Sequence, residues 1–175
     1  MKRIAALLVA VMMLVCASAM AEKTVLFTAE DGTQVTFDEI ENASLEMYVT
    51  TADVTMWIIT REGCNPIIVN CAPDTDDCGT LNDLTDEEMD EWLEDSLENE
   101  YTGNTIITVE TTEAGNKYWD ILTEEDGFVI YERWTIYSGF EFNRIMYGTE
   151  ITAEDVAFMD EVQAAMWVVA PEAAE

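Results

Sequence analysis

Three cysteines in the middle of the chain are the first residues whose type and spacing could do chemistry. Cys64, Cys71 and Cys78 are separated by six residues each. Zinc modules and redox motifs place their cysteines two residues apart, so these gaps fit neither chemistry. In an oxidising compartment we expect one disulfide and one leftover thiol, and the spacing leaves all three pairings open.

Aspartates follow the same segment and suggest a calcium loop, because hard cations bind several carboxylate oxygens in a flexible turn. They are Asp74, Asp76, Asp77 and Asp83. The EF-hand register fails, since Cys78 falls at the third ligand position and Thr85 falls where the bidentate Glu belongs. We predict no metal site and interpret the cluster as a solvated acidic turn, with a loose cation site as the alternative.

The sequence contains no histidine, which removes the commonest general base and both the Ser-His-Asp and Cys-His arrangements. Neither Lys23 nor Lys117 stands in the S-x-x-K context of a Ser-Lys hydrolase. Two carboxylates could hydrolyse a glycoside, but 37 acidic residues make any such pair uninformative. We predict no catalytic residues, no cofactor and no enzymatic activity, with a small carboxylate-dependent hydrolase as the alternative.

Aromatic side chains gather in the C-terminal half, where an exposed cluster could stack on sugars or grip a peptide. They are Tyr118, Trp119, Phe128, Tyr131, Trp134, Tyr137, Phe140 and Phe142. Strands alternate their side chains between two faces, and one face must be apolar to form a core, so we prefer core packing. Arg133 and Arg144 lie in the same segment and are expected to pair across strands or with acids.

The first 21 residues have the pattern of a secretory signal peptide. Lys2 and Arg3 precede an unbroken apolar run, Ile4 to Val15, and Ala19 and Ala21 form a small-residue cleavage site. The run is too short to cross a membrane, since twelve helical residues extend about 18 Å against a hydrocarbon core of roughly 30 Å.

The remaining residues, 22–175, form the predicted mature protein. A lipoprotein acylated at Cys16 is the alternative, but bulky Val15 precedes that cysteine where a small residue is expected. The style of the signal favours a bacterial source. We expect a protein that is secreted or lies in the cell envelope, and that is soluble after cleavage.

Acidic residues outnumber basic residues by 37 to 7, which gives a formal net charge of -30. Nucleic acid and anionic lipid are disfavoured as partners, because both attract proteins through Lys and Arg. The partners that remain compatible with this charge are cationic groups or basic protein surfaces, but we prefer the interpretation that names no ligand. This interpretation is a solvated coat that provides solubility.

The spacing of apolar residues predicts strands in both halves of the chain. Two hairpins come first, one around Asp31-Gly32 and one formed by residues 45–50 and 54–60. A short strand, Ile67 to Cys71, follows between irregular stretches. Short breaks then separate four strands that should form an antiparallel meander. These are residues 105–112, 117–123, 128–137 and 140–147.

Two helices are predicted to pack on this sheet, because capping boxes precede two segments of helical periodicity. Thr85 and Glu88 begin the helix over residues 86–99, and Thr152 and Asp155 begin the last helix. The apolar stripe of the first is Met89, Trp92, Leu93 and Leu97. That of the second is Val156, Met159, Val162 and Met166. Without repeats or a long linker, we expect a single α+β domain.

The order of these elements can be compared with known families. A strand around Trp57 precedes the helix from Asp86 to Asn99, and the last meander strand runs through Thr149 and Thr152 into a closing helix. In that order and C-terminal cadence, residues 54–169 resemble the PsbP-like superfamily, small lumenal or envelope domains with an antiparallel sheet between helices. The resemblance implies a non-catalytic binding or assembly role outside the cytoplasm. The chain lacks the lysines of the photosynthetic members, which argues against photosystem docking.

Together these features predict an exported, acidic, non-catalytic domain that acts in binding or as an accessory component. No sequence motif identifies its ligand. A carboxylate-dependent hydrolase and a loose divalent-cation binder remain the alternative functions.

Overall fold

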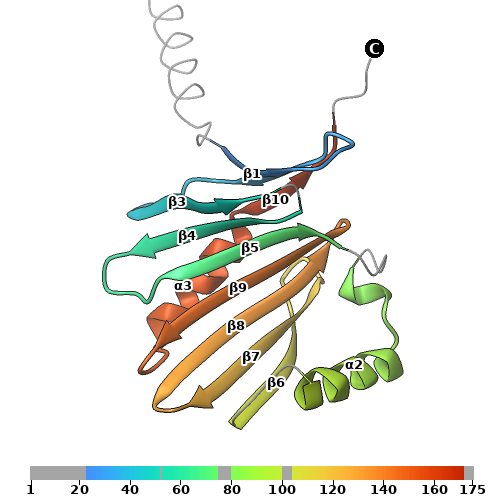
Figure 1. The fold of residues 1–175 in the computed structure, drawn as a ribbon, viewed down its shortest axis with the longest axis vertical. Helices are drawn as coiled ribbons and strands as arrows, with labels where there is room; N and C mark the ends of the chain where they lie inside the picture. The colour runs from blue at the N-terminus through green and yellow to red at the C-terminus, as the bar shows by residue number, and fades with distance from the viewer. Residues whose placement is uncertain (1–22, 52, 75–79, 100–103, 172–175) are drawn as a thin grey trace, which may run out of the picture.

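The computed structural model describes residues 23–51, 53–74, 80–99 and 104–171, and most of them lie in β-strands (Figure 1). Strands make up 53% of the structure and helices 19%. The predicted α+β class is therefore wrong, and the protein is mainly β. The sequence predicts the early strands as separate hairpins, but long-range pairing joins them to the later strands and makes sheet the dominant structure.

A seven-stranded antiparallel sheet forms the body of the protein. In spatial order its strands are β3 (Ala43–Thr50), β4 (Thr55–Arg61), β5 (Ile67–Pro73), β9 (Phe140–Gly148), β8 (Phe128–Tyr137), β7 (Lys117–Glu125) and β6 (Asn104–Thr111). The predicted meander is present as β6 to β9, each strand paired antiparallel with the next. Pairing of β5 with β9 places Val69 opposite Arg144 and unites the two halves of the chain.

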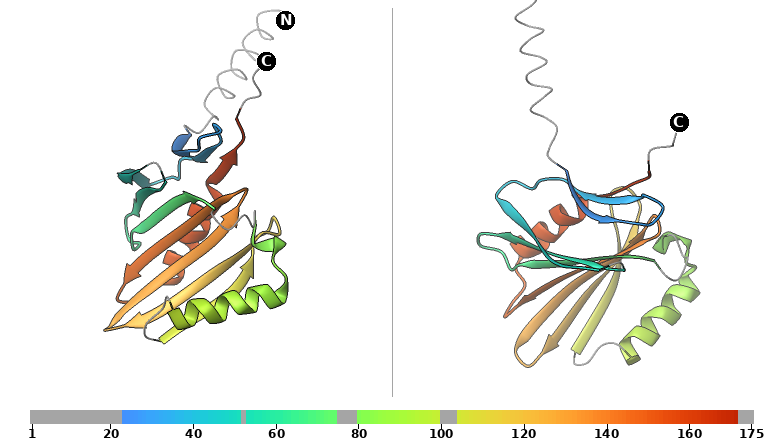
Figure 2. Two further views of the ribbon diagram at one scale, coloured as in Figure 1. Left: turned by 45° about the vertical axis from the view of Figure 1, so that its right-hand side comes forward. Right: turned by 45° about the horizontal axis from the view of Figure 1, so that its top comes forward.

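A smaller sheet contains three strands and lies beside the β3 to β5 end of the large sheet (Figure 2). Its strands are β1 (Thr24–Thr28), β2 (Gln34–Phe37) and β10 (Met166–Val169). The predicted hairpin is confirmed, and Gly32 in its turn has a φ of 88°, which glycine adopts without strain. Trp57 Nε1 donates to the Leu26 carbonyl at 3.1 Å and links the two sheets.

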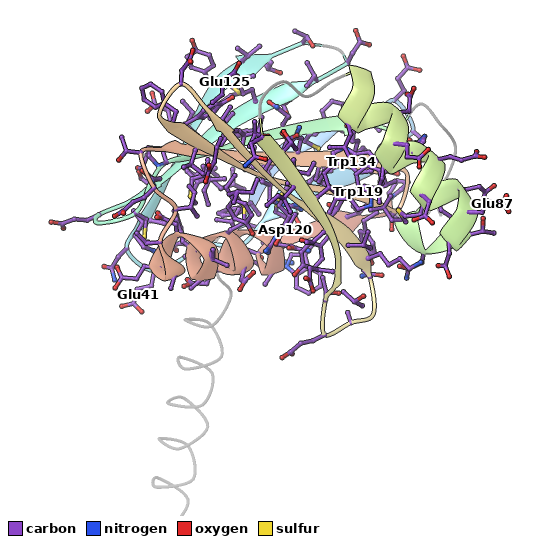
Figure 3. The ribbon with its side chains drawn as sticks, turned by 90° about the horizontal axis from the view of Figure 1, so that it is seen from below. Glu41, Glu87, Trp119, Asp120, Glu125 and Trp134 are labelled. Atoms are coloured by element: carbon purple, nitrogen blue, oxygen red, sulfur yellow. The ribbon has the colours of Figure 1, made fainter. Side chains whose placement is uncertain are left out.

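Two α-helices of the described ranges pack on opposite faces of the large sheet. The helix α2 (Asp86–Asn99) begins at its predicted capping box, where Glu88 Oε2 accepts from the Thr85 N–H at 2.9 Å. Figure 3 shows Trp119 and Trp134 on the side of α2, and Asp120 toward the other helix, α3 (Ala153–Ala164). Neighbouring residues of a strand point to opposite faces, so the Trp119 side chain lies on the α2 face of the sheet and the Asp120 side chain lies on the α3 face.

The buried side of α3 differs from the predicted stripe. Phe158, Met159 and Val162 are fully buried in the main core, whereas Val156 is 37% exposed. Met166 does not belong to the helix, since it opens β10 and pairs with Phe37. The apolar run 166–169 fits either the end of a helix or a strand. It forms a strand because it pairs with the free edge of β2.

The predicted signal peptide, with its cleavage residues Ala19 and Ala21, lies outside the described residues. Within the described residues, no helix is long and apolar enough to cross a membrane.

Candidate functional site

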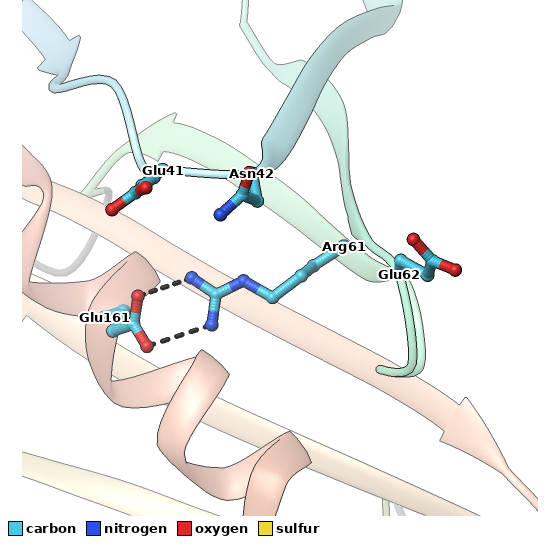
Figure 4. Close-up of a pocket in the computed structure, with 5 residues that line it drawn as sticks. All are labelled: Glu41, Asn42, Arg61, Glu62 and Glu161. Atoms are coloured by element: carbon cyan, nitrogen blue, oxygen red, sulfur yellow. Dashed lines mark hydrogen bonds and ion pairs between the residues drawn. The ribbon is translucent and has the colours of Figure 1, made fainter.

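An open pocket of about 510 Å³ lies where β4 ends, between the start of β3 and the side of α3 (Figure 4). Its lining residues are Glu41, Asn42, Arg61, Glu62 and Glu161. Three of the five are carboxylates and one is a guanidinium, so the pocket is a charged site rather than an apolar ligand cavity.

The register of the β3–β4 hairpin brings most of these residues together. Ala43 pairs with Arg61, so Asn42 just before β3 and Glu62 just after β4 lie at the same end of the hairpin. Asn42 has a φ of 59°, a left-handed conformation that asparagine tolerates better than most residues. Glu161 comes from α3, a hundred residues from Arg61. No sequence motif marks such a site, and the sequence analysis missed it.

Arg61 and Glu161 form a two-bonded ion pair across the pocket. Arg61 Nη1 donates to Glu161 Oε1 at 2.9 Å, Nη2 pairs with Oε2, and the guanidinium carbon lies 4.3 Å from the centroid of the Phe158 ring. The hydrogen bonds with Glu161 raise the pKa of Arg61, and the same bonds lower the pKa of Glu161. Glu161 thus neutralises Arg61, and Glu41 and Glu62 leave the pocket negative.

Four carboxyl groups of the described residues have a lowered pKa. Where the pKa of a carboxyl group departs clearly from its usual value it is lowered, because hydrogen bonds to the charged form outweigh burial. These groups are Asp31, Glu88, Asp155 and Glu161. A two-carboxylate hydrolase needs one carboxyl with a raised pKa, and none of these four groups has one.

Cys64 and Cys71, the two predicted disulfide candidates that lie within the described residues, do not form a disulfide. Cys64 and Cys71 are free thiols, and extended β5 separates Cys71 from the turn that holds Cys64. Cys78 lies outside the described residues, so its pairings stay predictions. Burial raises the pKa of Cys64 and raises that of Cys71 to about 12, so neither is a thiolate at neutral pH.

The acidic segment after β5 is only partly described, since Asp76 and Asp77 lie outside the described residues. Asp83 Oδ2 accepts from the Thr80 N–H at 3.1 Å and caps the short 3₁₀-helix η1 (Leu81–Asp83). Within the described ranges no group of three or more potential metal ligands converges.

Core packing accounts for most of the aromatic cluster. The rings of Trp119 and Trp134, labelled in Figure 3, lie 4.9 Å apart between centroids. Trp92 of α2 packs against both. Phe128 and Tyr137 are the exposed members, at 59% and 40%. The aromatic residues therefore do not assemble an exposed sugar or peptide platform.

The two arginines of the meander lie directly opposite each other on β8 and β9, on the face that α3 covers. Arg133 forms ion pairs with Asp120 and Asp160. Arg144 donates only to Thr135 Oγ1, at 3.3 Å. The expectation that these arginines pair across strands or with acids is therefore confirmed, since Arg133 pairs with acids and Arg144 bonds across the strands to Thr135.

No known family model matches the chain, and no curated protein matches it at a significant level. The resemblance to the PsbP-like superfamily remains a prediction that rests on the order of elements.

Proposed function

We propose that the protein is an exported, non-catalytic binding domain that recognises a cationic group at the pocket around Arg61. The charge of the pocket carries the proposal. Glu161 already neutralises Arg61, while Glu41 and Glu62 have no basic partner among the described residues. A ligand with a protonated amine or a guanidinium would compensate both free carboxylates.

The shape of the site favours a side chain of a partner protein over a small free molecule. Binding sites for small molecules are usually concave, mostly apolar and cover most of the ligand surface. This pocket is open and lined by charged and amide side chains. A lysine or arginine that projects from a basic surface could enter it while the rest of the partner stays outside.

The overall charge supports the same kind of partner. A formal net charge of -30 produces a negative potential over the surface, which speeds the approach of a basic protein and repels an acidic one. The pocket would then fix where a partner binds, and the acidic surface would set how quickly it arrives. If the acidic surface sets the association rate, that rate should fall steeply with added salt.

The proposal is tested by titrating the mature protein with a fluorescent lysine-rich peptide at low ionic strength. The variant carries Glu41→Gln and Glu62→Gln, and the control carries Glu94→Gln and Glu113→Gln, exposed acids on α2 and in the β6–β7 turn. Two rim charges are each worth about 1 kcal/mol or less, so we expect the pocket variant to lose about 5- to 30-fold in affinity. The control should lose less than about 3-fold.

Equal losses in the two variants would show that the peptide senses only the net charge, and the pocket would not be a site. Glycan turnover that is abolished by replacing one Asp or Glu would contradict the non-catalytic role and restore the hydrolase alternative.

A further inference from the structure

Arg144 carries a charge that the described residues leave without a carboxylate partner in the core. The residue is 2% exposed, in the middle of β9. Its Nη1 and Nη2 both donate to one oxygen, Thr135 Oγ1, at 3.3 Å, and its Nε is buried without a hydrogen-bond partner. A guanidinium has five N–H donors, so most donors of Arg144 lack an acceptor among the described residues.

The neighbouring arginine shows the compensation that Arg144 lacks. Arg133 is equally buried, and Asp120 accepts from its Nε at 2.7 Å and from its Nη2 at 2.9 Å. Asp160 accepts from Nη1 of Arg133 at 2.6 Å. The ion pairs of the described residues include none with Arg144.

Nearby acids compensate Arg144 only from a distance, since the Asp120 charge favours the protonated guanidinium without forming an ion pair with it. Arg133 occupies both oxygens of Asp120, and Asp160 is 60% exposed, so water screens its charge. Burial and the repulsion from Arg133 lower the pKa of Arg144 to about 9, which still leaves it protonated at neutral pH. A buried cation without a bonded counter-charge is strongly unfavourable, so an anion bound beside Arg144 would stabilise the folded protein.

We propose that Arg144 binds a small monovalent anion of the chloride class in the core, beside Thr135. The Thr135 hydroxyl accepts from Arg144 and can donate its own proton to the anion. The Phe142 ring, whose centroid lies 5.5 Å from the Arg144 guanidinium carbon, and buried Val69 make the surroundings apolar. Such surroundings select a small single charge, because a multiply charged oxyanion loses more hydration energy on burial. The site is independent of the pocket at Arg61.

Cys71 is the internal competitor for this role. A thiolate at Cys71 would compensate Arg144 without any bound ion, and the two groups interact. Burial outweighs that interaction and raises the pKa of Cys71 to about 12, so the thiol stays protonated at neutral pH. A bound anion would therefore supply the direct contact that neither the Cys71 thiol nor a carboxylate of the described residues gives to Arg144.

The test compares thermal unfolding of the mature protein in sodium chloride and in sodium gluconate at matched ionic strength. Both salts screen the surface charge, but gluconate is too large to enter the core. We expect a saturable stabilisation specific to chloride, with a midpoint raised by about 3 to 6 °C at ten times the dissociation constant. The variant Arg144→Met should lose this difference between salts and keep the stabilisation that both salts share.

Lys117→Met is the matched control, because it removes one positive charge from the opposite face of the same sheet and should keep the chloride-specific shift. Thr135→Val, a second variant, should weaken chloride binding and shift its midpoint to higher concentration. Equal melting of the native protein in the two salts would overturn the proposal. A thiolate absorbance from Cys71 at neutral pH would also overturn it, since the counter-charge would then be internal.

Discussion

Two arginines of the large sheet form ion pairs with α3, a buried one in the core and a partly exposed one at the rim of the sheet, beside the pocket. Arg133 on β8 bonds to Asp160, and Arg61 on β4 bonds to Glu161, the next residue of the helix. Successive residues of a helix point about 100° apart, so the two contacts hold α3 from different sides. The chemistry is the same in both places, and the surroundings differ.

Burial of the arginine separates the two contacts, because Asp160 and Glu161 are both half exposed or more. The Arg133 side chain is 2% exposed and has four hydrogen-bonding partners, the side chains of Asp120, Asp160, Gln163 and Tyr131. The Arg61 side chain is 20% exposed and its partner Glu161 is 50% exposed. An exposed pair contributes little because water competes for both ions, whereas removing one partner of a buried pair leaves a charge that water cannot reach. The comparison predicts a graded series of mutational effects.

The largest effect is expected from Asp120→Ala, which leaves the Arg133 guanidinium in the core without its two-bonded partner. We expect the free energy of unfolding to fall by about 3 to 5 kcal/mol, measured by urea denaturation. Arg133→Met, which fills similar space without charge, should cost less than Asp120→Ala. If Asp120→Ala cost under about 1 kcal/mol, the buried contact would be no stronger than a surface pair.

A smaller effect is expected at the start of α3, where Asp155 is buried and joins the helix to the turn after β4. It accepts from the backbone N–H of Asn65 at 2.7 Å and of Thr152 at 2.9 Å. Asp155→Ala removes the capping box and these bonds, and should cost about 1 to 3 kcal/mol in the same denaturation experiment. A loss of that size from Glu154→Ala, an exposed neighbour, would mean that the cap is not responsible.

The Asp155 carboxyl group should also contribute to the pH dependence of the unfolding free energy. Burial would raise the pKa of Asp155, but the hydrogen bonds from Asn65 and Thr152 outweigh it and lower the pKa. A lowered folded pKa contributes stability that is fully present above the unfolded value of about 4 and disappears as the pH falls through the folded value. Asp155→Asn should therefore flatten the decline in unfolding midpoint below pH 4. An unchanged decline would assign acid sensitivity to other carboxylates.

The rim contact should give the weakest mutational effect. Glu161→Gln keeps the shape of the side chain and removes its charge, and we expect a change of about 1 kcal/mol or less in unfolding free energy. A loss comparable to that of Asp120→Ala would contradict the distinction between the core and the rim.

The smallest difference of the series is expected when the effects of Glu161→Gln and Asp120→Ala on unfolding free energy are measured again at high salt. At 1 M salt the Debye length is about 3 Å, so the small cost of Glu161→Gln should vanish while the cost of Asp120→Ala remains. The native protein itself should gain stability with ionic strength, because screening reduces repulsion within a chain of formal net charge -30. A denaturation midpoint that stays flat or falls would remove the repulsion argument.

Sequence alone determined the features that depend on neighbouring residues. The Asp31-Gly32 turn, the capping box at Thr152 and the short breaks of the meander all appear as predicted, because turns and caps are decided within about four residues. The absence of histidine and the excess of acids also follow from the sequence without any structure.

Only the tertiary structure determined which strands pair and which side chains of the sheet contact α3. Pairing of β5 with β9, and of β10 with β2, changed the fold class, and the contact of Arg61 with Glu161 created the pocket. Within the described ranges, Arg144 forms no ion pair, whereas Arg133 on the neighbouring strand forms two. In an acidic chain every arginine has many candidate partners in sequence, and only the packed structure limits which carboxylates come within reach.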